Sequence, residues 1–305
     1  MQEINELIRK YHLKPKKYTK KNNTICIETE TEKYVIKENK KDNKILDYLK
    51  TRNFDYIPKI INNKYDKYKI MEYIDSIEVP AEQKIIDLID LVSLLHYKTT
   101  HYKEITEDTY KETYEDLKNN IEYLYSYYND LITIIETKVY MSPCEYLIAR
   151  NISTIFKSIS IAYEKLEEWY QIVKDKKKQR LVVLHNNLEL DHFIDNGKKY
   201  LISWNKSKIG IPIFDLYKLY LKHGLEFDFQ ELLKRYEKNY PLLEEEKKLL
   251  FILMLLPQKI NLDKTEYDNT KEVGRMVDYI YKTEMIVSPY YSNKRPKNNT
   301  DKNNN

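Results

Sequence analysis

The spacing of hydrophobic and polar positions divides the chain into regions of different period. In residues 24–37, β-branched residues alternate in part with polar ones, and the polar stretch Glu28–Glu32 separates two apolar runs, which predicts a β-hairpin. Residues 43–50 carry apolar side chains at helical spacing, and residues 68–74 read as a further strand. The order strand, strand, helix, strand predicts a small α+β lobe over residues 1–75.

A long helical region follows Pro80, and two of its segments carry a stronger pattern. Their apolar residues step by four and three in alternation, which places them on one face of each helix. Thr109 with Glu112, and Ser142 with Glu145, are predicted as capping boxes that begin the two helices. Because only about six residues join them, we expect an antiparallel helical hairpin whose apolar rows pack on each other. The two rows are Tyr110, Tyr114, Leu117, Ile121, Leu124, Tyr128, Leu131 and Ile135, and Ile148, Ile152, Ile155, Ile159, Ala162, Leu166, Trp169 and Val173.

After the second of these helices the period changes to two. The basic run Lys174–Arg180 is expected to end the helix, where positive charge complements the helix dipole. Residues 193–202 read as a β-hairpin with Asn196 and Gly197 at its turn.

The remainder of the chain reads as helical over residues 215–283, and its last segment, Ser292–Asn305, contains no apolar residue and is expected to be disordered. The predicted organisation is a small lobe at 1–75, a helical lobe at 76–291 with a distinct loop at 184–204, and a tail at 292–305.

Composition excludes several classes of function. The 52 basic and 48 acidic residues of the 305 leave a net charge of only +4, which argues against a nucleic-acid partner. Cys26 and Cys144 stand alone, so neither a thiolate metal site nor a disulfide framework is expected. The first glycine is Gly197, which rules out a Walker A loop or a GxGxxG fingerprint before it. With no signal-peptide pattern and no apolar run of membrane-spanning length, we expect a cytoplasmic protein without a membrane partner.

Several short motifs follow one another in an order that points to a known family. They are Tyr34-Val35-Ile36-Lys37, Lys69-Ile70-Met71-Glu72-Tyr73-Ile74, Leu91-Val92-Ser93-Leu94-Leu95-His96, the stretch from Leu184-His185-Asn186-Asn187 to His192-Phe193-Ile194, Leu201-Ile202-Ser203-Trp204, and Ile211-Pro212-Ile213-Phe214-Asp215-Leu216. Together they resemble the aminoglycoside phosphotransferase and choline kinase superfamily, including its spore-coat relatives, over about residues 24 to 225. The resemblance implies an α+β, bilobal protein-kinase-like fold, with a small N-terminal β lobe and a large helical C-terminal lobe.

The resemblance also implies where a nucleotide would bind. Lys37 matches the family's nucleotide-binding lysine, and Glu72 and Ile74 match its hinge. In that family an aspartate in the catalytic loop accepts the substrate proton, and an asparagine and a second aspartate hold magnesium on the phosphates.

This sequence departs from the family's pattern at all three of these positions. Asn187 stands at the position of the base, His192 at that of the asparagine, and Ser203 at that of the metal aspartate, whereas His185 and Asp215 remain. A carboxamide cannot accept the proton, and loss of a general base costs on the order of 10²- to 10⁴-fold in rate. A hydroxyl and an imidazole bring no negative charge for magnesium, so no metal site is expected. The resemblance implies that Asp215 lies beneath the loop and supports it by accepting its backbone N–H groups.

The sequence therefore favours a catalytically impaired kinase-fold protein, a pseudokinase that binds an unidentified small molecule or protein. ATP stays open as a ligand, and magnesium is not expected. Two alternatives remain at this stage. One is a divergent ATP-dependent phosphotransferase that uses a relocated acid such as Glu189 or Asp191, and the other is a structural component of a coat-like assembly.

Overall fold

The computed structural model describes residues 2–21, 24–38, 44–62 and 66–292. The chain divides into two compact units. The first comprises residues 1–102, 180–219 and 232–241, and the second comprises residues 103–179, 220–231 and 242–305. The predicted tail at 292–305 lies outside the described residues except for Ser292, which ends the last helix.

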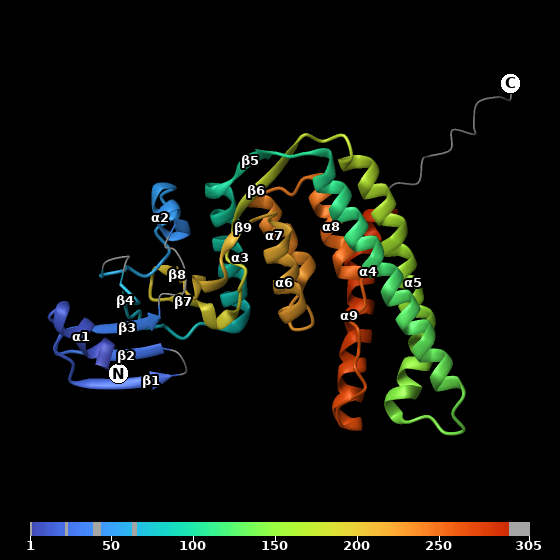
Figure 1. Cartoon of the computed structure of the whole chain (residues 1–305), viewed down its shortest axis with the longest axis horizontal. Helices are drawn as coiled ribbons and strands as arrows, with labels where there is room; N and C mark the ends of the chain where they lie inside the picture. Colours follow the sequence, from blue (N-terminus) through green and yellow to red (C-terminus); the bar gives the residue numbers. More distant parts are fainter. Residues whose placement is uncertain (1, 22–23, 39–43, 63–65, 293–305) are drawn as a thin grey trace. The chain divides into compact units, whose positions relative to one another are not determined.

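The first unit begins with an antiparallel sheet covered by a helix (Figure 1). Four strands lie in the order β1-β2-β3-β4, and α1 buries Ile4, Leu7 and Ile8 against Ile36 and other isoleucines of the sheet. These elements are α1 (Gln2–Lys10), β1 (Lys17–Lys21), β2 (Thr24–Glu28), β3 (Lys33–Glu38), α2 (Lys44–Thr51) and β4 (Tyr68–Glu72). The predicted hairpin, the helix near residue 45 and the strand near residue 70 are confirmed.

The rest of the first unit surrounds the loop at residues 184–204. Helix α3 (Ala81–Thr99) begins directly after Pro80, as the sequence predicted. Strand β6 (Lys178–Leu184) leads into the loop and pairs antiparallel with β9 (Lys208–Gly210), while β7 (Phe193–Asp195) and β8 (Lys199–Leu201) form the predicted hairpin. Helices α6 (Ile213–His223) and α7 (Phe229–Asn239) follow, and the first unit contains α6 up to Leu219 and α7 from Leu232.

The second unit is helical, and α4 (Glu107–Glu136) and α5 (Pro143–Val173) form its long antiparallel hairpin (Figure 1). Helix α5 also packs on α8 (Glu244–Leu255) and α9 (Glu266–Ser292). This additional contact explains why Asn151 and Ser158 are buried on α5 beside the predicted apolar row. Of the predicted row of α4, Tyr110, Ile121, Leu124, Tyr128 and Ile135 are buried. Tyr114 and Leu117 are only half-buried, and near the end of the helix Ile132 is buried in place of Leu131.

The two predicted helix starts have different outcomes. At α5 the Ser142 hydroxyl accepts a hydrogen bond from the Glu145 N–H, and the Glu145 carboxylate accepts one from the Ser142 N–H, so the capping box is confirmed. The box predicted at Thr109 is wrong, because α4 begins earlier, with Thr106 at its N-cap.

Three further details differ from the sequence expectations. Only the first residue of the basic run, Lys174, lies at the end of the second helix, because α5 stops at Val173. Lys178–Arg180 belong to β6. The helical region 215–283 is interrupted by turns between α6, α7, α8 and α9. Among the α-helices and strands of the described residues, α1, β1, β5 (His101–Glu104) and β9 were not predicted. Within the part of the chain that the structure describes, no helix is long and apolar enough to cross a bilayer.

Candidate functional site

The backbone of the loop after β6 turns through left-handed conformations at two positions. Asn186 has φ = 60° and Ser203 has φ = 67°. Most side chains disfavour this region, and asparagine, aspartate and glycine tolerate it best. Asn186 is therefore a residue type that suits this turn. Its side-chain carbonyl accepts a hydrogen bond from Lys218 at 2.5 Å, and its amide donates to the Lys206 carbonyl at 2.8 Å.

Asp215, in the first turn of α6, lies beneath this loop and is fully buried. Its Oδ2 accepts the His185 N–H at 2.8 Å, and its Oδ1 accepts the Asn186 N–H at 2.6 Å. Both carboxylate oxygens therefore serve the backbone of the loop. A buried N–H without a partner costs about 1 to 3 kcal/mol, so these bonds fix the loop strongly.

A histidine on α3 extends the support of Asp215 into the core. His96 is fully buried, with its Nε2 3.2 Å from Asp215 Oδ2 and its Nδ1 2.6 Å from the Tyr236 hydroxyl on α7. The chain Asp215–His96–Tyr236 thus ties the loop to two helices. Sequence reasoning placed His96 in a helix motif without a role and did not single out Tyr236.

His185 is the second buried histidine of the site. Its Nε2 lies 2.8 Å from the Ile202 carbonyl, and its ring packs edge-on against Trp204. Burial is the main reason why the pKa of His185 lies below its usual 6.5, and the nearby Asp215 carboxylate opposes that shift. The Nδ1 atom is buried and has no hydrogen-bond partner among the described residues. The neutral ring therefore donates from Nε2 and links the two ends of the loop.

Asn187 and His192 contact each other on the open side of the loop. His192 Nδ1 lies 2.7 Å from the Asn187 main-chain oxygen, and the Asn187 side-chain nitrogen lies 3.3 Å from the same ring atom. The short contact with a carbonyl requires a proton on Nδ1. Both residues are half-buried.

The resembled family uses magnesium, and the residues at its ligand positions do not fit that ion. Magnesium prefers anionic oxygen ligands in an octahedral shell. His192 offers an imidazole nitrogen and Ser203 a neutral hydroxyl, while Asp215 is occupied beneath the loop. Across the described residues, no group of three His, Cys, Asp or Glu side chains is arranged to hold a metal ion.

The three residues expected to contact a nucleotide lie on or beside β3 and β4. Lys37 is half-buried on β3, and burial lowers the pKa of its ammonium group. Glu72, at the end of β4, uses its carboxylate to accept the Lys59 N–H at 2.7 Å. Ile74 follows β4 and is half-buried. The structure thus brings His185, Asn187, His192 and Asp215 together in and beneath the loop. Lys37 and Glu72 instead lie in the sheet, and Ile74 lies in the segment that follows β4.

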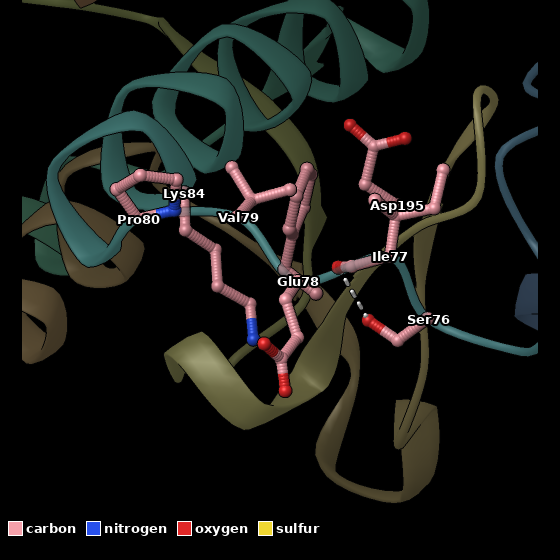
Figure 2. Close-up of a pocket in the computed structure, with 8 residues that line it drawn as sticks. Ser76, Ile77, Glu78, Val79, Pro80, Lys84 and Asp195 are labelled. Atoms are coloured by element: carbon pink, nitrogen blue, oxygen red, sulfur yellow. Dashed lines mark hydrogen bonds between the residues drawn. The ribbon is translucent and has the colours of Figure 1, made fainter.

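A pocket of about 560 Å³ lies beside the segment that follows β4 (Figure 2). It is lined by Ser76–Pro80, Lys84, Phe193 and Asp195. Figure 2 shows Glu78 and Lys84 extending to the same side, while the Asp195 carboxylate points away from them. Asp195 Oδ1 accepts the Gly197 N–H at 2.8 Å, so this carboxylate is engaged in its own turn. None of the sequence-predicted site residues lines the pocket.

Comparison with known proteins identifies the fold. No protein-family model and no curated protein matches the sequence. Among solved structures, an aminoglycoside phosphotransferase from Alicyclobacillus acidocaldarius superposes with a TM-score of 0.70 over 94% of each chain, at 8% identity. A spectinomycin phosphotransferase in complex with ADP and spectinomycin gives a TM-score of 0.53 at 13% identity, over 93% of this chain and 98% of that one. Its AMP complex gives 0.55 at 12% identity, over 92% and 97%. The predicted α+β kinase-like fold is therefore confirmed, and it is the fold of the aminoglycoside phosphotransferases.

Proposed function

We propose that this chain is a kinase-fold binding protein that does not transfer phosphoryl groups, and that it acts by binding a small molecule or a protein. One observation carries the proposal. Asp215 holds the loop through two backbone hydrogen bonds, whereas the positions that would perform the chemistry hold Asn187, His192 and Ser203.

The chemistry of these residues supports the proposal step by step. Asn187 cannot take a proton from a substrate hydroxyl, so general-base catalysis at that position is lost. Ser203 has no charge with which to hold a divalent cation against a triphosphate. The remaining carboxylate of the motif, Asp215, already accepts two backbone hydrogen bonds and would leave the loop unsupported if it moved.

The direct test combines turnover with ligand-dependent stability. Purified protein is incubated with magnesium and ATP, and release of ADP is measured with and without aminoglycosides and choline as acceptors. We expect no turnover above background. In thermal unfolding, a ligand at about 100 times its Kd should stabilise the protein by about 2.7 kcal/mol. We expect any stabilisation by ATP to be unchanged by magnesium.

A matched pair of variants tests the reason for this magnesium indifference. Ser203→Asp restores a carboxylate, while Ser203→Asn has nearly the same shape, tolerates the left-handed backbone and carries no charge. Stabilisation by ATP should gain a dependence on magnesium in the aspartate variant only. Magnesium-dependent turnover by the wild-type chain, lost in Asp191→Asn or Glu189→Gln, would instead show a phosphotransferase with a relocated acid.

A further inference from the structure

Two lysines lie directly opposite each other on one face of the β1–β4 sheet. The antiparallel register of β3 and β4 pairs Lys37 with Lys69 and Ile36 with Ile70. Side chains alternate between the two faces of a strand, and Ile36 and Ile70 point into the core with α1. Lys37 and Lys69 therefore share the opposite face, where directly paired residues have Cβ atoms about 5 Å apart.

Partial burial disfavours the charged form of both lysines. Both lysines are half-buried, and burial is the main cause that lowers the pKa of each. Asp47 on α2 opposes the shift at Lys69, and the Cys26 thiol opposes it at Lys37. Like charges directly opposite each other in a sheet are destabilising.

A third lysine on the same strand shows the contrast. Lys33 lies on the same face of β3 as Lys37, since the two are four residues apart. It is exposed, and its Nζ forms a 3.0 Å ion pair with Asp75. No hydrogen bond or ion pair of this kind joins Lys37 or Lys69 to another side chain among the described residues. Positive charge is therefore concentrated at the partly desolvated pair, where an anion from outside the chain would be held most strongly.

We infer that Lys37 and Lys69 together bind the phosphate groups of an anionic ligand without a divalent metal. This inference rests on the proposed function and specifies its ligand class, a di- or triphosphate. Lys69 adds a second positive charge, and this charge takes the place of a magnesium ion, for which Ser203 and His192 bring no anionic ligand. The four-carbon stems of the two lysines allow both ammonium groups to reach neighbouring phosphates of one chain.

The test measures binding of two probes by isothermal titration calorimetry in excess EDTA. Inorganic tripolyphosphate supplies linked phosphate groups alone, and ADP supplies linked phosphate groups together with a nucleoside. The variants Lys37→Met and Lys69→Met are compared with Lys33→Met, a matched control on the same strand and face. We expect each of the first two variants to weaken binding about tenfold or more, since a charge-assisted hydrogen bond is lost, and Lys33→Met to leave it unchanged.

The two probes also separate the sources of the phosphate. Similar affinities would identify a polyphosphate ligand, and much tighter binding of ADP would identify a nucleotide. Thermal unfolding without ligand confirms that each variant is folded, because methionine keeps the apolar stem at a half-buried site. Absence of wild-type binding in EDTA, or an equal loss in Lys33→Met, overturns the inference. Turnover with magnesium and ATP would overturn the proposed function alone, because the EDTA experiment measures neither turnover nor a metal complex.

Discussion

Beneath the loop that follows β6, Asp215, His96 and His185 are completely buried, whereas Asn187 and His192 on its open side are half-buried. The buried residues bond to backbone groups and to each other, and those bonds are needed whenever the chain is folded. The open-side residues bond mainly to one another. The geometry of this loop therefore depends on the buried polar groups beneath it more than on the residues of its open side.

Of the residues beneath and on the open side of the loop, Asp215 is expected to have the largest effect on stability. Asp215→Ala leaves the N–H groups of His185 and Asn186 buried without their acceptor, and it also removes the partner of His96 Nε2. We expect the free energy of unfolding to fall by about 2 to 4 kcal/mol. Lys37→Ala, which removes no hydrogen bond or ion pair among the described residues, should change it by less than about 1 kcal/mol. Urea denaturation of the two variants measures the difference, and a greater loss in Lys37→Ala would break the comparison.

The next effect is a dependence of stability on pH that originates at His185. Its folded-state pKa lies below 6.5, mainly because of burial, so the folded chain resists protonation there. Below about pH 6.5 the unfolded chain takes up a proton that the folded chain does not. Stability should therefore fall with decreasing pH until the lowered pKa is reached, by about 1.4 kcal/mol per pH unit.

His185→Gln tests the origin of that slope. A glutamine amide can still donate to the Ile202 carbonyl, but it does not titrate. Urea denaturation between about pH 7.5 and about pH 5 should give a smaller loss of stability in this variant. The control is His12→Asn, at an exposed position whose positive φ asparagine tolerates. An unchanged slope in His185→Gln would assign the pH dependence to other groups.

A smaller loss is expected at the far end of the support chain. Tyr236→Phe removes the hydroxyl that lies 2.6 Å from His96 Nδ1 and leaves that buried nitrogen unpaired. The free energy of unfolding should fall by about 1.5 kcal/mol. Tyr97→Phe, on the exposed side of the same helix as His96, should change it by less than about 0.5 kcal/mol. If both variants behave alike in urea denaturation, Tyr236 is not part of the support.

The sequence predicted most of the regular elements because their patterns are local. The capping box of Ser142 and Glu145 and the Asn196-Gly197 turn each combine a residue preference with a short spacing. The same reasoning failed at Thr109, where an equally good spacing lies inside α4. Helix α1 has apolar residues at positions 4, 7 and 8, a helical spacing that sequence reasoning passed over.

In the candidate site too, the residues within one local motif could be predicted from the sequence, and the pairings between distant residues could not. The loop positions followed from motif order along the chain. The pairings of His96 with Tyr236 and of Lys37 with Lys69 join residues far apart in sequence, and only strand register and helix packing reveal them. For Lys69 a signal was available, since β3 and β4 were both predicted and lysine is unusual at a covered position of a sheet.

The smallest effect on the free energy of unfolding is expected at Asn187, on the open side of the loop. Its side chain reaches His192 Nδ1 only at 3.3 Å, and the shorter contact of that ring atom is with the main-chain oxygen, which every residue keeps. Asn187→Ala should therefore change the free energy of unfolding by less than about 0.5 kcal/mol in urea denaturation. A loss above about 1 kcal/mol would show that the open side of the loop also supports the fold. Asn187→Asp should be equally tolerated and still give no release of ADP from magnesium and ATP, because an added base cannot act while Ser203 leaves the metal without a ligand.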